Sequence, residues 1–180
     1  MEASMDKRII RTKRAIRSAF LDLRKEQPLE EIKVIDICAL SVINKTTFYK
    51  YYTDIFDLNA AIENEVFTSF MGDFKEFHSL FINTSGFIQN MNDALVKQGP
   101  IFNTLFSDRV DKFFSMLERA MKAYYLENPP SNLSLLKTDF ILAGVIHTFK
   151  EMQLNRNYDL DLLIRELEEI IRAVSVYSGQ

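Results

Sequence analysis

The side chains that carry acid–base, nucleophilic or metal chemistry are few in this chain, and they form no motif. His78 and His147 are its two histidines and Cys38 is its one cysteine, and none of them has an HExxH or CxxC neighbour. The sequence also lacks the GxGxxG and GxxxxGK(S/T) phosphate loops and the GxSxG nucleophile motif. These observations predict a protein that is not an enzyme and that uses no metal and no cofactor.

Hydrogen-bond donors gather instead in residues 34–52, which read VIDICALSVINKTTFYKYY. This stretch predicts a short helix, a three-residue break and a second short helix, which is helix-turn-helix spacing. A helix in the major groove of DNA needs donors for base edges and phosphates on one side and packing residues on the other. Phe48 and Tyr52, four residues apart, form the packing side. The residues left for DNA are Lys45, Thr46, Thr47, Tyr49, Lys50 and Tyr51.

Within this stretch the first helix is predicted over 34–40 and the second over 45–51, with a break at 41–43. Asn44 is a good N-cap for the second helix, because its side-chain oxygen can accept a hydrogen bond from a backbone amide of the first turn. Lys33 immediately precedes the first helix. Lys33 and Asn44 complete the predicted DNA-binding set.

A longer helix is predicted on each side of this motif. Ser4 or Asp6 can cap the helix before it, which must end before Pro28. Its apolar stripe, at helical spacing, is Ile9, Ile16, Phe20 and Leu23. Thr53 or Asp54 can cap the helix after it. That helix carries the stripe Leu58, Ile62, Val66 and Phe70.

Four breaks punctuate the rest of the chain. They fall at Gly86, at Gly99-Pro100, at 128–130 and at 155–157. The segments between them predict helices over 85–98, 101–127, 132–154 and 159–177. The third of these is apolar nearly all round, and the fourth has one apolar stripe, so we expect a homodimer through residues 132–177. Charges at Ile146 and Ile170 together are expected to disrupt it.

Composition favours an all-α protein without a membrane span. Five Gly and four Pro in 180 residues leave few signals for the tight turns of a sandwich or barrel. One cysteine excludes an internal disulfide framework. The best apolar stretch, 140–146, is far shorter than the roughly 20 residues that a membrane helix needs, and the first residues lack an apolar signal core. We therefore expect a cytoplasmic protein.

Charge is distributed unevenly along the chain. Residues 1–53 carry 11 Lys and Arg against 7 Asp and Glu, a net charge of +4, whereas residues 54–180 carry 11 against 18, a net charge of −7. Six of the eleven cations lie between Lys7 and Arg17. Such a cluster favours an anionic partner, although a solvated helix face has the same composition.

Residues 12–58 resemble the TetR/AcrR family of bacterial transcriptional regulators. The resemblance lies in the basic first helix, in V-x-D-I at 34–37, in T-F-Y-x-Y-Y at 47–52 and in D-L at 57–58. It implies a helix-turn-helix DNA-binding domain at 1–53 and a larger helical domain at 54–180 for effector binding and dimerisation. It further implies a repressor that binds double-stranded DNA at an inverted-repeat operator and that a small-molecule effector releases. By analogy with the family, bases would be approached by Lys45 and Thr46, and phosphates by Thr47, Tyr49, Lys50 and Tyr51.

Two positions depart from the family pattern. Val42 stands where a turn glycine is usual, so the turn is either built differently or strained, because a β-branched residue resists positive φ. Ile55 stands where a phosphate-binding lysine is usual. These departures keep an alternative open, a helical protein-interaction module with weakened or lost DNA binding.

Aromatic residues and methionines are concentrated after residue 54. They can line a pocket for a small apolar or aromatic effector, or they can simply form the core. The candidate pocket residues are Phe70, Phe74, Phe102, Phe106, Phe113, Met116 and Phe140.

Overall fold

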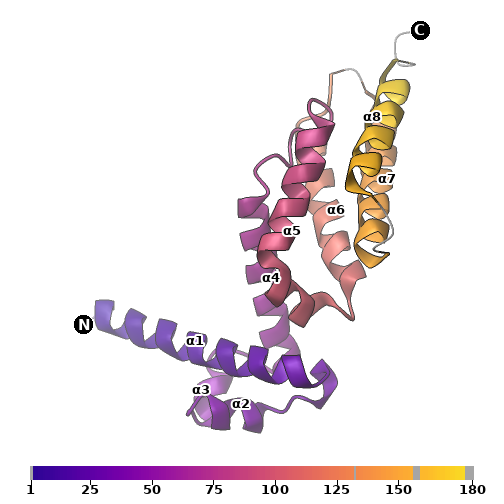
Figure 1. The fold of residues 1–180 in the computed structure, drawn as a ribbon. Coiled ribbons are helices and arrows are strands. Elements are labelled where there is room, and N and C mark those ends of the chain that lie inside the picture. The colour runs from indigo at the N-terminus through magenta and orange to yellow at the C-terminus, as the bar shows by residue number, and fades with distance from the viewer. Residues whose placement is uncertain (1, 132, 156–158, 177–180) are drawn as a thin grey trace. The chain divides into compact units, whose positions relative to one another are not determined.

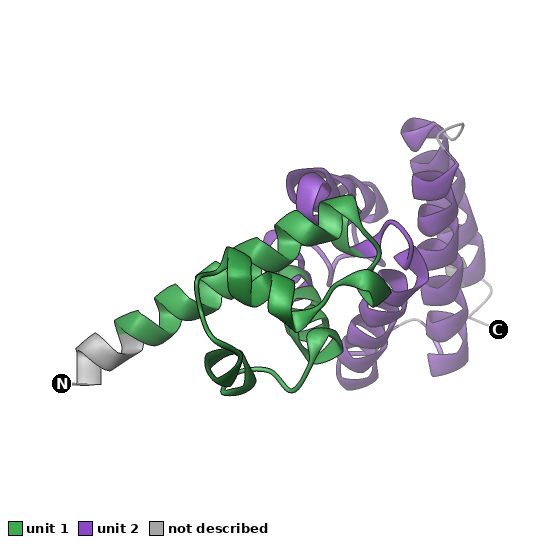
Figure 2. Ribbon diagram, turned by 90° about the horizontal axis from the view of Figure 1, so that it is seen from below, with its two compact units in different colours: residues 1–66, 103–105 green, residues 67–102, 106–180 purple. Residues whose placement is uncertain are grey.

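The computed structural model describes residues 2–131, 133–155 and 159–176, and in these ranges the chain forms eight α-helices, one short 3-10 helix and no strand (Figure 1). The all-α fold class is therefore confirmed. The chain divides into two compact units (Figure 2). Unit 1 comprises residues 1–66 and 103–105, and unit 2 comprises residues 67–102 and 106–180.

Unit 1 begins with helix α1 (Glu2–Glu26). The helix starts before Ser4 and Asp6, so neither residue is its N-cap, contrary to the prediction. The reason is that Glu2 and its neighbours are good helix formers, and an acidic residue in the first turn interacts favourably with the helix dipole. The predicted end before Pro28 is confirmed. The chain then forms a single 3-10 turn, η1 (Leu29–Glu31).

Two short helices and the first part of a longer one complete unit 1. They are α2 (Val34–Leu40), α3 (Lys45–Tyr49) and α4 (Ile55–Asp73). Asp54 caps α4, since its carboxylate accepts from the Asp57 amide at 2.8 Å, while the Asp57 carboxylate accepts from the Thr53 amide at 2.8 Å. This reciprocal pair satisfies two amides at the helix start.

The core of unit 1 collects apolar side chains from all four of these helices. Those with no exposed surface include Ile16, Phe20, Ile37, Phe48 and Leu58. The early residues of α4 belong to this core, and the first segment of unit 1 ends at Val66. An ion pair between Arg17 and Glu65, 3.3 Å apart, also joins α1 to α4.

Unit 2 contains the rest of α4 and four further helices, the first of them without residues 103–105. These are α5 (Thr84–Phe106), α6 (Val110–Glu127), α7 (Leu135–Leu154) and α8 (Leu160–Val176). Residues 132 and 177, at the predicted limits of the last two, lie outside the described residues. Two ion pairs cross from α6 to α7, Lys122 to Asp139 at 2.8 Å and Lys150 to Asp111 at 2.9 Å.

Helix α5 corrects two predicted breaks. Gly86 lies in its first turn, where its amide donates to the Asn83 side chain at 3.0 Å, so it belongs to a capped helix start. Pro100 lies inside the same helix. The Val96 carbonyl, which a proline cannot bond, belongs to a residue that is 70% exposed, so water can satisfy it. Buried residues on both sides of Pro100 hold the helix together. They are Met91, Ala94, Leu95, Leu105 and Phe106.

Candidate nucleic-acid interface

The turn between α2 and α3 closes with two hydrogen bonds back to α2. The Val42 amide donates to the Ala39 carbonyl at 3.3 Å, and the Ile43 amide donates to the Cys38 carbonyl at 3.0 Å. This pair of bonds defines a Schellman motif, which places its C′ residue in the left-handed region. Val42 is that residue, with φ of 54°, and no other non-glycine residue in the described part of the chain has a positive φ. The sequence left two alternatives, a turn that is built differently and a turn that is strained. The structure has the strained turn.

Asn44 caps α3 as predicted. Its side-chain oxygen accepts from the Thr47 amide at 2.8 Å and from the Thr47 hydroxyl at 2.9 Å. The side-chain oxygen is committed to the cap, so the amide nitrogen is the group that Asn44 can offer to a ligand. Thr47 lies half-buried behind it.

Helix α3 ends at Tyr49, two residues before the predicted end at residue 51. The reason is that the Tyr51 and Tyr52 amides both donate to the Phe48 carbonyl, at 2.9 and 3.1 Å, which tightens the last turn and redirects the chain. Lys50 is the C-cap.

Burial divides α3 into two faces. Phe48 has no exposed surface, and its ring lies 5.5 Å from the Tyr49 ring and 5.8 Å from the Tyr52 ring. Tyr49 is 55% exposed, and Tyr51 is half-buried. The other exposed residues predicted to bind DNA are Lys33, Asn44, Lys45, Thr46 and Lys50. The structure thus brings the predicted residues of α3 onto one side, with Phe48 on the other, and it places Lys33 at the N-cap of α2.

A hollow of about 810 Å³ lies between α1 and the α2–α3 segment. Its lining residues are Arg8, Thr12, Cys38, Ala39, Val42, Ile43, Asn44, Thr47, Lys50 and Tyr51. The Lys13 ammonium nitrogen lies 5.7 Å from the centre of the Tyr51 ring, a cation–π contact that also joins α1 to the end of the motif. Sequence reasoning did not assign Arg8 and Thr12 to the interface, although the cluster of cations between residues 7 and 17 was its signal.

Three residues near this surface serve the core. Ile55, at the usual lysine position, is only 6% exposed. Burial raises the pKa of the Cys38 thiol, with Lys45 opposing, so this thiol stays neutral at physiological pH. Burial also raises the pKa of Tyr52, and the carboxylates of Glu65 and Asp57 add to it.

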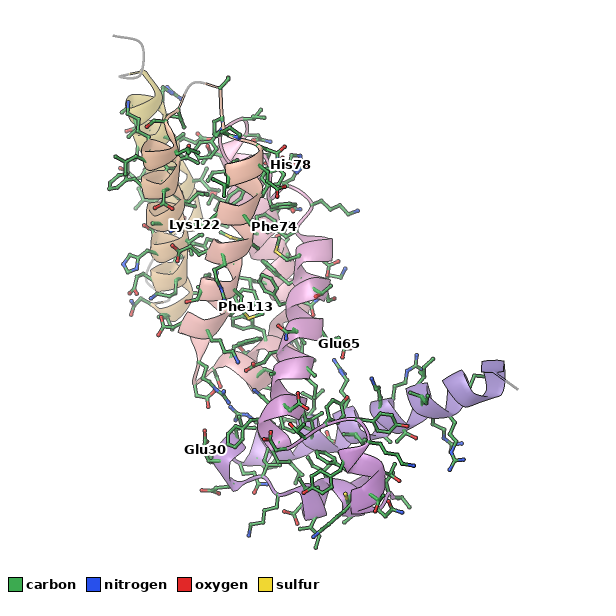
Figure 3. The ribbon with its side chains drawn as sticks, turned by 180° about the vertical axis from the view of Figure 1, so that it is seen from behind. Glu30, Glu65, Phe74, His78, Phe113 and Lys122 are labelled. Carbon is green, nitrogen blue, oxygen red and sulfur yellow. The ribbon has the colours of Figure 1, made fainter. Side chains whose placement is uncertain are left out.

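Five of the aromatic candidates for an effector pocket, Phe70, Phe74, Phe102, Phe106 and Phe113, form ring contacts with one another in unit 2. Phe74 and Phe113 are labelled in Figure 3. Phe70, Phe74, Phe106 and Phe113 have no exposed surface, and the Phe113 ring lies 5.0 Å from that of Phe70. Phe102 and Met116 are half-buried. Phe140 instead lies on the outside of α7 and is 69% exposed. The structure therefore places six of the seven in or beside the core and does not bring Phe140 to them.

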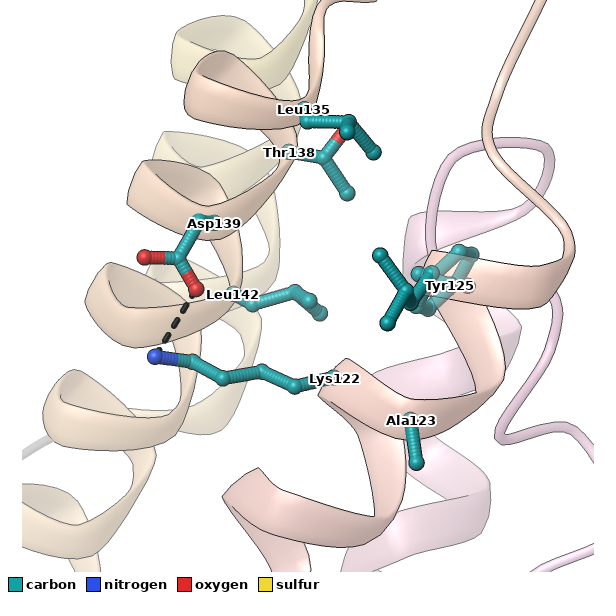
Figure 4. A pocket seen from close by; sticks show the side chains of 8 residues that line it. Lys122, Ala123, Tyr125, Leu135, Thr138, Asp139 and Leu142 are labelled. Carbon is teal, nitrogen blue, oxygen red and sulfur yellow. Dashed lines mark ion pairs between the residues drawn. The ribbon is translucent and has the colours of Figure 1, made fainter.

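Unit 2 has a hollow, but it lies away from the predicted aromatic pocket. A slot of about 320 Å³ opens between α6 and α7 (Figure 4). Its lining residues are Lys122, Ala123, Tyr125, Leu126, Leu135, Thr138, Asp139 and Leu142. None of the seven predicted pocket residues is among them. The Lys122 ammonium forms ion pairs with the Asp139 carboxylate at 2.8 Å and with the Glu118 carboxylate at 2.9 Å. These interactions raise the pKa of the ammonium.

The outer faces of α7 and α8 carry exposed apolar residues. Leu136 is 81% exposed, Phe140 is 69% exposed and Ile170 is 51% exposed. His147 lies on the exposed face of α7 as well. Ile146, however, is only 4% exposed within a single chain, so it is a core residue and not a suitable position for testing an interface. Apolar periodicity could not distinguish the two roles, because α7 is apolar on more than one side.

Comparison with known proteins leaves the family open. No protein-family model matches the chain, and the search of curated proteins found no match. Across the described ranges, no three or more His, Cys, Asp or Glu residues are grouped so that they could hold a metal ion. In the same ranges no helix combines the length and the hydropathy that crossing a bilayer requires.

Proposed function

We propose that the protein is not an enzyme but a sequence-specific DNA-binding regulator of the TetR type, in which α3 enters the major groove. One observation carries the proposal. Helix α3 buries Phe48 completely and turns Lys45, Thr46 and Tyr49 to solvent. A short helix with hydrogen-bond donors on one side and a buried aromatic anchor on the other is what major-groove recognition requires.

The two lysines of this surface have different tasks. Lys45 is the first residue of α3, next to the Asn44 cap, and from there its ammonium can reach a guanine edge. Lys50 lies at the far end, as the C-cap, and contacts a phosphate. Thr46 accompanies Lys45 at the bases, and Tyr49 and Tyr51 accompany Lys50 at the backbone.

Unit 2 supplies dimerisation and control in this proposal. The exposed apolar residues of α7 and α8 pair with those of a second copy across a two-fold axis, which makes the operator an inverted repeat. The slot between α6 and α7 takes a small apolar or aromatic effector, since Ala123, Leu126 and Leu142 form its walls. Effector binding releases a repressor from DNA, and DNA weakens effector binding by the same factor.

The decisive experiment is selection of duplexes from a random library by the full chain. We expect an enriched inverted repeat. Lys45→Ala should relax the base preference at one position of each half-site and cost about 1–3 kcal/mol there. Lys50→Ala should weaken binding to all duplex sequences alike. It should also lower the slope of log affinity against log salt concentration by about 1 per neutralised phosphate. Lys75→Ala, at an exposed lysine of unit 2, is the matched control.

A second function has one observation in its favour. Exposed apolar side chains gather around the same motif, with Ile35 at 55%, Leu40 at 58%, Val42 at 89% and Phe56 at 58%. Such residues suit a protein partner better than a phosphate backbone. If the selection enriches no sequence and the chain retards no duplex at low salt, this interaction-module proposal replaces the first.

A further inference from the structure

Helix α1 is longer than its packing against α2 and α3 requires. It spans 25 residues, and its N-terminal end extends past both short helices (Figures 1 and 2). Five cations occupy two turns of the N-terminal half of α1 and are all exposed: Lys7, Arg8, Arg11, Lys13 and Arg14. No acidic residue occurs from residue 7 to residue 21. Residues 7–21 of α1 therefore carry positive charge without an acidic residue among them.

The hollow beside α1 connects this charge to the end of the α2–α3 segment. Arg8 and Thr12 lie one helical turn apart on α1 and form one wall, while Lys50 and Tyr51 belong to the opposite wall. Among the side chains that the structure describes, no Asp or Glu lines it. The Thr12 hydroxyl donates to the Arg8 carbonyl at 2.9 Å, which fixes the threonine and leaves the guanidinium of Arg8 as the main donor of this wall.

We propose that this hollow binds the sugar–phosphate backbone of the duplex, with Arg8 and Lys50 as its two cationic contacts. The inference rests on the proposed DNA-binding function and extends the DNA-contacting surface from α3 to α1. The lining offers guanidinium, ammonium, amide and hydroxyl donors without a carboxylate. That composition matches a chain of phosphates, which demands donors and repels anions.

Charge complementarity argues for a polyanion over a single small anion. The hollow is open and wide enough for more than one phosphate group, and four further exposed cations lie within two turns of Arg8 on the same helix: Lys7, Arg11, Lys13 and Arg14. Arginine also suits the task, because its guanidinium can bond two phosphate oxygens at once. The Lys13 contact with the Tyr51 ring holds the Tyr51 side chain between the two helices.

Arg14 is the matched control for Arg8. Both are exposed arginines of α1, but Arg14 lies six residues on, roughly 120° round the helix at about 100° per residue, and does not line the hollow. The variants Arg8→Ala and Arg14→Ala therefore have the same net charge and the same helix propensity. Circular dichroism is the check that both variants remain folded.

The test measures binding of the full chain and both variants to the selected duplex, or to a 30-base-pair duplex of mixed sequence at low salt, over a range of salt concentrations. We expect Arg8→Ala to bind about five- to tenfold more weakly for each lost phosphate contact near 0.1 M salt, with a slope lower by about 0.9 for each lost contact. Arg14→Ala should bind within about twofold of the parent chain. A second measurement uses duplexes with single neutral methylphosphonates. A methylphosphonate at one position of the duplex should weaken binding by the parent chain and leave binding by Arg8→Ala unchanged.

Each outcome has a distinct meaning. If the parent chain and Arg14→Ala bind no duplex, the proposed function itself fails and this inference fails with it. If the parent binds and Lys50→Ala weakens it, but Arg8→Ala equals Arg14→Ala, the DNA-binding function stands and the phosphate hollow is wrong. If Arg8→Ala is weaker but no single methylphosphonate is coupled to it, Arg8 acts through the long-range field alone and the hollow is again wrong.

Discussion

The side-chain oxygen of Asn44 accepts two hydrogen bonds from the same residue, one from the Thr47 amide at 2.8 Å and one from the Thr47 hydroxyl at 2.9 Å. The pair fixes the start of α3 and, with it, the direction in which Lys45 and Thr46 leave the helix. Local helix capping and the proposed DNA contact therefore depend on the same side chain.

We predict that Asn44→Ala lowers the free energy of unfolding by about 1 kcal/mol, because the Thr47 amide loses its cap. Asn44→Asp keeps an acceptor in place and should preserve stability within about 0.5 kcal/mol. The aspartate adds a negative charge to the proposed DNA surface, so it should still weaken binding to duplex DNA. Urea denaturation and a DNA titration on both variants test this pair. Full-strength DNA binding by Asn44→Asp would remove Asn44 from the interface.

We predict that Val42→Gly stabilises the protein by about 1 kcal/mol. A β-branched residue at positive φ costs about 1–3 kcal/mol, whereas the extra freedom of glycine in the unfolded chain costs about 0.4–1 kcal/mol. Val42 is 89% exposed, so its removal loses little packing. Val42→Ala is the control, since alanine keeps most of the strain. A glycine variant with a lower midpoint of urea unfolding than the alanine variant contradicts the strain argument.

We predict that Phe140→Asp yields a folded monomer. The side chain is 69% exposed in one chain, so the charge disrupts association between copies without entering the core. Ile146→Asp should instead unfold the chain, because that position is 4% exposed and a buried unpaired charge is severely destabilising. Sedimentation measures the oligomeric state and circular dichroism measures folding. Dimers that persist in Phe140→Asp would exclude this face of α7 from the interface.

We predict that Phe113→Ala costs about 3–5 kcal/mol of stability, as expected of an aromatic core residue with rings on several sides. The Phe113 ring lies 4.8 Å from Phe102, 5.0 Å from Phe70 and 5.3 Å from Phe106. Ile82→Ala, at a residue that is 87% exposed in the same unit, should change stability by less than about 0.5 kcal/mol. A Phe113→Ala variant of near-normal stability would indicate a ligand cavity at this cluster.

We predict that Asp73 makes the protein sensitive to acid. Hydrogen bonds from Lys97 and then from Gln98 lower the pKa of this carboxyl below its ordinary value of 3.8. A group whose pKa is lower in the folded state stabilises the protein above its unfolded pKa, and this stabilisation disappears as the pH falls through the folded pKa. Asp73→Asn should therefore flatten the loss of stability below about pH 4. Thermal unfolding of both chains from pH 6 to pH 2.5 tests it, and parallel curves contradict it.

Much of unit 1 follows from local signals that are visible in the sequence. Helix α2 has the predicted limits, Asn44 caps α3, Phe48 is buried and Pro28 stops α1. Each of these depends on a capping side chain, a proline or an apolar spacing within a few residues. The same kind of reasoning identified Val42 as a problem, although only the backbone dihedral decided that the turn is strained.

Tertiary packing decided the rest. Pro100 does not end α5, because buried residues on both sides hold the helix continuous where a local rule predicts a break. Ile146 and Phe140 lie on one apolar helix, yet one is in the core and the other on the surface, since neighbouring helices cover only part of α7. Arg8 lines a hollow with Lys50, 42 positions away in the chain. A sequence records the chemistry of such residues, but their proximity and exposure arise only when helices distant in the chain pack together.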